Sequence, residues 1–142
     1  MYVTIKLIQE RYNVLNNMCF SNELPTNVRF LLHDSFKLLG QYSYTLNRYN
    51  EVTRHSISIS RNYDWDGDML DDIILHEMIH EYIYYYQLKI GRNTHGAIFI
   101  KFMNEFNQKF GRNIAVRPPL SAMTPVPGTS KLKWWFVKTF TI

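Results

Sequence analysis

The stretch Ile74 to Tyr82, ILHEMIHEY, contains two histidines four residues apart, with a glutamate directly after the first. On a helix of about 3.6 residues per turn, His76 and His80 lie on one face, one turn apart, so both imidazoles can bind one metal ion. Glu77 lies about 100° further round the helix, where its carboxylate can reach a water on the metal without being a ligand. The motif therefore predicts a helix that carries two zinc ligands and a general base.

A catalytic zinc ion usually has three protein ligands and one water, so this motif requires a third ligand from elsewhere in the chain. A metzincin would have a histidine six residues after His80, but Tyr86 occupies that position. The other candidates are His33, His55, His95 and Glu105.

Among these candidates, spacing favours His95, which follows the turn 91–94 at the start of a predicted helix. If that helix packs antiparallel on the HExxH helix, its first residues return toward the zinc face; otherwise His95 is a helix cap or a surface residue. An apolar stripe on the same helix is expected to be core and consists of Phe99, Phe102, Met103, Phe106 and Phe110. Glu105 lies off this stripe, so we expect it to face solvent. His33 and His55 fall on or beside predicted strands and are interpreted as structural or surface residues.

Hydrophobic periodicity predicts an α+β, zincin-like fold with a small antiparallel sheet of about three strands. The short connections favour a meander, and the acidic stretch before residue 69 is interpreted as a helix cap rather than a calcium loop. The predicted helices are 4–19, 69–89 and 95–110, and the predicted strands are 28–32, 37–45, 55–60 and, near the C-terminus, 131–138.

The length of 142 residues fits one domain, with a core at about 5–117 and a basic aromatic tail at 118–142. Cys19 is the single cysteine, which excludes an intrachain disulfide and a cysteine-cluster zinc site. No apolar stretch reaches the ~18 residues of a membrane span, and the charged N-terminus does not resemble a signal peptide. We therefore expect a cytoplasmic protein that does not enter a membrane.

The positive charge of the chain is concentrated near its C-terminus. Residues 1–88 contain seven Lys and Arg against eleven Asp and Glu, whereas residues 89–142 contain nine Lys and Arg and only Glu105. This surface either serves solubility or faces a polyanion. In the second case we expect single-stranded DNA to contact Lys131, Lys133, Trp134 and Trp135, since lysines follow phosphates and indoles stack on unpaired bases. The alternative for the two tryptophans is packing against the core.

Together, HEMIH and the later His95-Gly96-x-x-Phe99 resemble the SprT-like family of zinc metallopeptidases, which includes the protease domain of Spartan. Upstream, Asn16 or Asn17, Phe20 and Leu24-Pro25 resemble the N-terminal signature of the family, and LLGQYSY and HSISIS resemble its two strands ahead of the metal helix. The resemblance covers about residues 5–117. It implies zinc ligands at His76, His80 and His95, a catalytic Glu77, and substrates that include proteins crosslinked to DNA. The four-cysteine zinc ribbon of many relatives is absent here, so one Zn2+ ion is expected.

The resemblance leads to a mechanism in which Glu77 takes a proton from a zinc-activated water that attacks a peptide carbonyl. Tyr84, one turn beyond His80, either stabilises the oxyanion as a residue near the metal or simply packs. Two alternatives stay open. One is a non-proteolytic module that keeps zinc for stability and binds nucleic acid or protein. The other is a deformylase-like hydrolase, which would need a cysteine ligand on a strand, whereas Cys19 lies on a predicted helix. The oligomeric state is not predicted.

Overall fold

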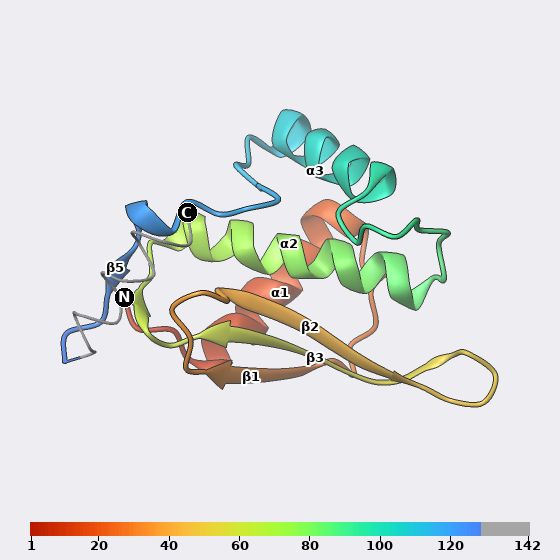
Figure 1. Ribbon diagram of the computed structural model, residues 1–142, viewed down its shortest axis with the longest axis horizontal. Helices are drawn as coiled ribbons and strands as arrows, with labels where there is room; N and C mark the ends of the chain where they lie inside the picture. Colours follow the sequence, from red (N-terminus) through yellow and green to blue (C-terminus); the bar gives the residue numbers. More distant parts are fainter. Residues whose placement is uncertain (129–142) are drawn as a thin grey trace.

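The structure, a computed structural model, describes residues 1–128 and has the predicted α+β composition. The predicted strand at 131–138 and the tail residues Lys131, Lys133, Trp134 and Trp135 lie outside the described residues. The elements are α1 (Ile5–Phe20), β1 (Arg29–His33), β2 (Gly40–Leu46), β3 (Val52–Ser60), β4 (Tyr63–Asp64), α2 (Gly67–Tyr85), α3 (Ala97–Phe110), the 3-10 helix η1 (Leu120–Ala122) and β5 (Thr124–Pro125) (Figure 1).

The three-stranded sheet is mixed, so the prediction of an antiparallel meander is wrong. Its order is β1-β3-β2, with β3 parallel to β1 and antiparallel to β2. The strand directions alternate as in a meander, but loop 34–39 crosses the end of β3 and places β2 at the far edge. Backbone hydrogen bonds from Ser60 to Leu39 and from Arg61 to His33, both 2.9 Å, hold this crossing. Six residues easily span the ~10 Å that separates next-nearest strands.

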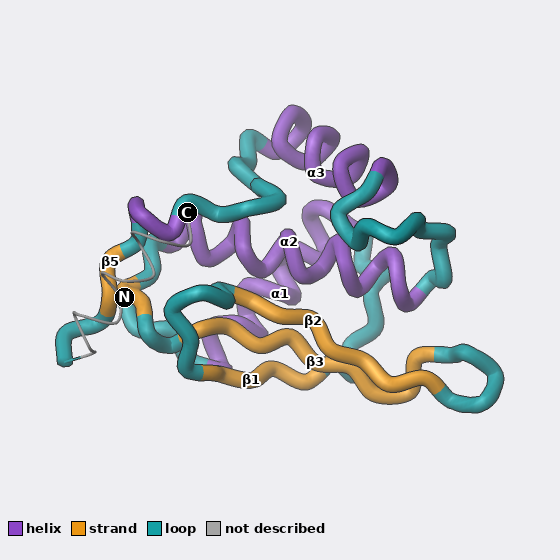
Figure 2. Tube along the Cα trace, viewed as in Figure 1, coloured by secondary structure: helices purple, strands orange, loops and turns teal. Residues whose placement is uncertain are grey.

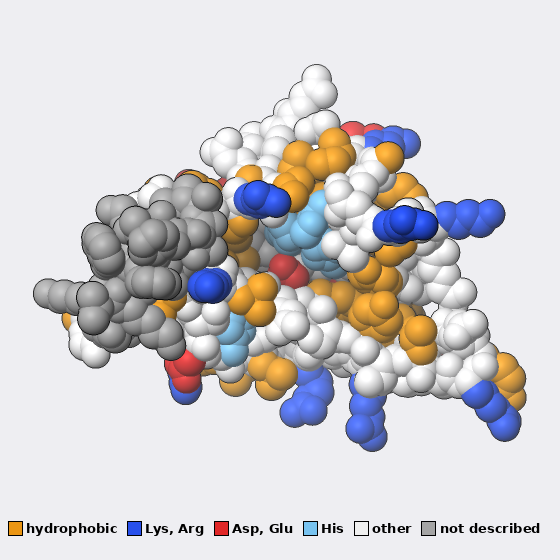
Figure 3. All heavy atoms as spheres, in the orientation of Figure 1, with side chains coloured by type: hydrophobic (Ala, Val, Ile, Leu, Met, Phe, Trp, Pro, Cys, Tyr) orange, Lys and Arg blue, Asp and Glu red, His pale blue; other side chains and the backbone are white. Residues whose placement is uncertain are grey.

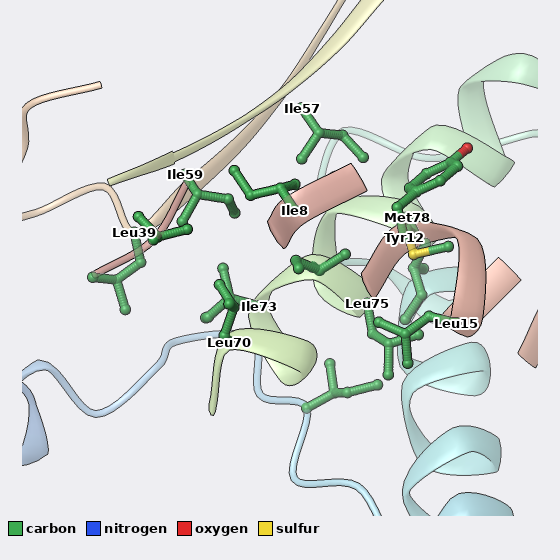
Figure 4. Packing of buried hydrophobic residues seen from close by; sticks show 14 of the residues in the cluster. Ile8, Tyr12, Leu15, Leu39, Ile57, Ile59, Leu70, Ile73, Leu75 and Met78 are labelled. Carbon is green, nitrogen blue, oxygen red and sulfur yellow. The ribbon is translucent and has the colours of Figure 1, made fainter. Parts of the chain in front are cut away.

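Helix α2 is the centre of the molecule. It lies between the sheet and α3, with α1 against it from behind (Figure 1). Buried side chains from α1, the sheet and α2 meet in one core, as the packing of Ile8, Ile57 and Leu75 illustrates (Figure 4). Because α2 is covered on several sides, it is apolar over most of its circumference, and its polar side chains stand out as exceptions.

The connection after α1 explains the N-terminal sequence signature. Asn16 is buried, donates from Nδ2 to the carbonyl of Leu24 at 3.1 Å and accepts from the Leu24 amide at 3.2 Å. The side chain of Asn16 thus takes the place of a backbone hydrogen-bond partner for the amide and carbonyl of Leu24, in the loop after α1. Without it, these groups at the end of the helix would be left unsatisfied. Phe20 and Leu24 are both buried beside it, so the signature fixes how the chain leaves α1.

The ends of α2 follow local capping chemistry. Asp66 accepts hydrogen bonds from the amides of Asp68 and Met69 at 2.9 and 3.2 Å, which confirms the capping interpretation of this acidic stretch. The helix ends at Tyr85, four residues earlier than predicted, because Gln87 adopts φ 53° and the Leu88 amide bonds back to Ile83 at 2.9 Å. Among the residues that the structure describes, no helix combines the length and apolar character needed to cross a bilayer.

Candidate metal centre

The structure brings together His76, His80 and His95, which come from α2 and from the loop ahead of α3. The Nε2 atoms form a triangle with sides of 3.3 Å for His76–His80, 3.1 Å for His80–His95 and 3.2 Å for His95–His76. Within the described part of the chain, this is the group of His, Cys, Asp and Glu side chains whose geometry can hold a metal ion.

The size of the triangle fits a tetrahedral metal site. With Zn–N bonds of about 2.0–2.1 Å, two tetrahedral ligands lie about 3.3–3.4 Å apart. Three converging imidazole nitrogens also make poor partners for one another, because a neutral imidazole offers one donor and one acceptor. A cation between them satisfies all three lone pairs, so three nearby histidines of this kind can bind a metal, consistent with zinc.

All three histidines are in the state that a metal requires. Burial lowers the pKa of His76 to about 4 and of His80 to about 3, and it lowers the pKa of His95 in the same direction. The rings are therefore neutral near pH 7. The Nδ1–H of His76 donates to the carbonyl of Ala115 at 2.9 Å, which leaves the Nε2 lone pair directed at the other two rings.

Phe99 forms an apolar floor under the three rings. Its ring centroid lies 4.8 Å from His76, 4.7 Å from His80 and 4.8 Å from His95, and the side chain is buried. The apolar stripe of the predicted helix 95–110 is expected to be core, and Phe99 is indeed buried. The spacing of the stripe did not reveal that Phe99 also fixes the histidine rings, and the signal for this is its position four residues after His95.

A tight turn presents His95 to the other two histidines. The amide of His95 donates to Oδ1 of Asn93 at 3.0 Å, and the amide of Gly96 donates to the Asn93 carbonyl at 3.1 Å. A Cβ on Gly96 would lie 3.0 Å from that carbonyl oxygen. The glycine after His95 therefore allows the turn to close, and α3 starts directly behind it.

Glu77 lies beside the histidines and against the sheet. Its Oε1 is 3.9 Å from Nε2 of His76, and the residue is 5% exposed. Burial raises the pKa of Glu77 to about 8, while a hydrogen bond from the backbone of Tyr42 acts against this rise. A cation at the three imidazoles would favour the charged carboxylate. Gly40 makes the approach possible, since a Cβ there would lie 3.1 Å from Cγ of Glu77 and 2.9 Å from Cγ2 of Ile73.

A cleft opens over this group of side chains, with a volume of about 350 Å³. It is bordered by β2 and by the loops 34–39 and 86–96, which Figure 2 draws on either side of α2. Figure 3 shows histidine side chains and an acidic side chain at the bottom of a hollow in the middle of one face. The lining residues besides His76, Glu77, His80 and His95 are Lys37, Leu38, Leu39, Gly40, Gln41, Tyr42, Tyr44, Ile73, Tyr84, Thr94, Val116 and Pro118.

The remaining candidates lie apart from the histidine triangle. His33 contacts Oγ of Ser58 and the carbonyl of Leu38, as expected for a structural residue. His55 is buried and bonds to Oδ1 of Asn27 at 3.0 Å. Glu105 is exposed on α3. Tyr84 lines the cleft with its ring stacked on that of Tyr44, and an oxyanion role for its hydroxyl stays a prediction.

Comparison with known proteins points to one family. A sequence model of the SprT-like family matches residues 8–118, which is most of the chain and includes all three histidines and Glu77. The protein belongs to the SprT-like family. A search of curated proteins finds no match to this chain. SprT-like domains are generally associated with zinc metallopeptidase activity, so the family and the histidine triangle point to the same class of chemistry.

Proposed function

We propose that this SprT-like protein is a zinc-dependent metallopeptidase in which His76, His80 and His95 bind one Zn2+ ion and Glu77 is the general base. The observation that carries the proposal is the convergence of three neutral Nε2 atoms, 3.1–3.3 Å apart, beside a buried carboxyl group at the bottom of a cleft. A structural zinc site is usually closed by four protein ligands, whereas this set supplies three and opens toward solvent.

The residues of the chain divide the work of hydrolysis among them. Zinc bound here supplies a Lewis acid, which acidifies a water and polarises the peptide carbonyl. Glu77 accepts the proton of the attacking water and delivers it to the leaving amine. Gly40 and the Tyr42 amide hold this carboxyl group in place, the Ala115 carbonyl holds the tautomer of His76, and Phe99 excludes water from beneath the rings.

For the substrate, we propose proteins associated with or crosslinked to DNA. The support is family membership together with the basic C-terminal sequence, in which Lys131, Lys133, Trp134 and Trp135 would contact single-stranded DNA. These four residues lie outside the described part of the chain. The matched test is salt-dependent binding of a single-stranded oligonucleotide by the native chain and by a Trp134→Ala, Trp135→Ala double variant.

Metal content and cleavage should be measured together on the full chain. We expect one zinc per chain, cleavage of a DNA-bound protein that stops after chelation, and recovery when zinc is returned. Omitting the DNA from a parallel reaction tests whether DNA stimulates the activity.

The same assay separates the competing function. A zinc-stabilised binding module predicts full zinc occupancy with no cleavage of free or DNA-bound protein under any of these conditions. That result would overturn the peptidase proposal while leaving the metal site intact.

A further inference from the structure

Three tyrosine rings form a continuous stack along one end of the cleft. Tyr42 and Tyr44 come from β2 and Tyr84 comes from α2. The ring of Tyr44 lies 4.6 Å from that of Tyr84 and 5.8 Å from that of Tyr42, and Tyr42 and Tyr84 are 6.4 Å apart. The interplanar angles are 29°, 22° and 17°, so all three rings are nearly parallel. All three side chains line the cleft that holds the histidines.

A hydrogen bond fixes the Tyr42 ring of the stack, whereas the rings of Tyr44 and Tyr84 are accessible to a ligand. The hydroxyl of Tyr42 bonds to Nδ1 of His55 at 3.1 Å, which fixes that ring against the core. Tyr44 is 36% exposed and Tyr84 is half-buried. Within residues 1–128, neither of these two hydroxyls has a hydrogen-bond partner. Tyr44 and Tyr84 thus present an accessible apolar ring surface together with a hydroxyl group. Such a surface is suited to binding a ligand rather than to filling a core.

We propose that the stack of Tyr42, Tyr44 and Tyr84 is a subsite for one large apolar or aromatic side chain of an extended peptide, about two residues from the cleaved bond. The position relative to that bond rests on the proposed peptidase function.

Two distances, one along α2 and one along β2, place the subsite about two residues from the cleaved bond. Tyr84 follows His80 by four residues, which is about 6 Å along the helix axis. On the strand, Tyr44 follows Tyr42 by two residues, about 7 Å, and the Tyr42 amide is the one that bonds to Glu77. An extended peptide advances about 3.3 Å per residue, so either measure corresponds to about two residues.

A peptide fits this end of the cleft better than a nucleic acid does. Strand β2 pairs only with β3 in the described sheet. Beyond the Tyr42 amide, which bonds to Glu77, its other edge can accept an extended peptide through backbone hydrogen bonds. Of the described residues that line the cleft, Lys37 is the one cation, and it lies on the opposite side of Gly40 from the tyrosines. A base stacked on the rings would therefore lack partners for its phosphates.

Peptide binding tests the subsite without depending on cleavage. The probes are labelled peptides of one sequence in which a single position carries Phe, Leu, Ser or Asp, and this position is moved along the peptide. Affinity is measured by fluorescence anisotropy with the zinc-loaded Glu77→Gln protein, and the native protein identifies the bond that is cut. We expect Phe and Leu to bind about tenfold more tightly than Ser at one position, about two residues from that bond.

Variants assign the preference to the rings. In the same background, Tyr44→Ala and Tyr84→Ala should abolish the tenfold preference, whereas Tyr84→Phe, which keeps the ring, should preserve it. Tyr49→Ala is the matched control, because Tyr49 lies at the tip of the same hairpin and is 65% exposed. An unchanged preference in Tyr44→Ala would overturn the subsite, as would a single-stranded oligonucleotide that displaces the Phe peptide from the native rings but not from Tyr44→Ala.

Failure of the subsite and failure of the peptidase proposal give different results. A ring-dependent preference in a protein that cleaves nothing supports the subsite and contradicts the peptidase. Cleavage without any ring-dependent preference contradicts the subsite and leaves the peptidase standing.

Discussion

Two glutamates on α2, one turn apart, are both buried and yet have different surroundings. Glu77 is 5% exposed and Glu81 is fully buried, and burial raises the pKa of each to about 8. Glu81 accepts from the hydroxyl of Tyr12 at 2.9 and 3.1 Å and lies 3.3 Å from Nδ1 of His55. Glu77 bonds to the backbone of Tyr42 and otherwise faces the cleft.

The difference shows that burial alone does not identify a catalytic carboxyl group. The partners of Glu81 come from α1 and β3, so this carboxyl group joins three elements of the fold, and it is fully buried away from the cleft. The carboxyl group of Glu77 is held on one side and free toward a histidine triangle on the other. An incompletely partnered buried group is costly, and such a cost is expected at a functional site.

The largest expected effect comes from removing the metal beside Glu77. His95→Ala should weaken zinc binding by more than about 100-fold and abolish cleavage, because two histidines remain where three were available. Zinc is measured by metal analysis after equilibration with a chelator. His33→Ala is the control, since His33 lies outside the triangle. Unchanged zinc stoichiometry in His95→Ala would show that another residue is the third ligand.

Removing Glu81 should lower stability rather than catalytic activity. Glu81→Ala removes the buried carboxyl group that contacts both Tyr12 and His55, which should lower the free energy of unfolding by about 2–4 kcal/mol. Urea denaturation measures this loss, with Glu105→Ala as the control because Glu105 is exposed. If both variants unfold at the same urea concentration, Glu81 does not have the structural role described above.

A side chain at Gly40 should disturb Glu77 but not Glu81. The Cβ of Gly40→Ala would approach Ile73 and Glu77 to 2.9 and 3.1 Å, and such overpacking costs about 1–3 kcal/mol. A displacement of the carboxyl group by about 1 Å can lower kcat by about 100-fold. Kinetics on the folded variant should therefore show a loss in kcat beyond the change in stability. A drop in stability with kcat intact would mean that Gly40 only packs.

The smallest effect is expected for Tyr12→Phe. This variant removes the hydroxyl, whose single proton can be donated to Glu81 at 2.9 Å or to the carbonyl of Pro25 at 3.0 Å, while the ring stays in the core. The free energy of unfolding should fall by about 1 kcal/mol, and kcat should not change. A clear loss of kcat would contradict the division between a structural and a functional glutamate.

The sequence predicted the parts of this molecule that depend on helical spacing. The register of ILHEMIHEY puts His76 and His80 on one face of α2, and the structure has them there with Glu77 beside them. Spacing favoured His95 but left the other candidates for the third ligand open, and the resemblance to SprT-like proteins singled out His95.

Other features could not be predicted because they do not depend on periodicity. The strand order β1-β3-β2 follows from loop 34–39 crossing the end of β3. The alternation of apolar and polar residues in each strand is the same for this order and for a meander, so the sequence does not distinguish them. His76 donates a hydrogen bond to the backbone carbonyl of Ala115. Every residue has such a carbonyl, so the amino-acid types do not indicate which one His76 contacts. Gly40 was assigned to a strand, but the glycine alone did not indicate which side chain approaches it.

The most direct test of the central claim is a paired measurement on Glu77→Gln and Glu81→Gln, each zinc-loaded, with kcat and melting temperature determined on the same samples. Glu77→Gln should retain zinc and melt within a few degrees of the native protein, while kcat falls about 10²–10⁴-fold. Glu81→Gln should melt at a lower temperature and keep most of its kcat. Persistent cleavage by zinc-loaded Glu77→Gln would contradict the claim that Glu77 is the catalytic base.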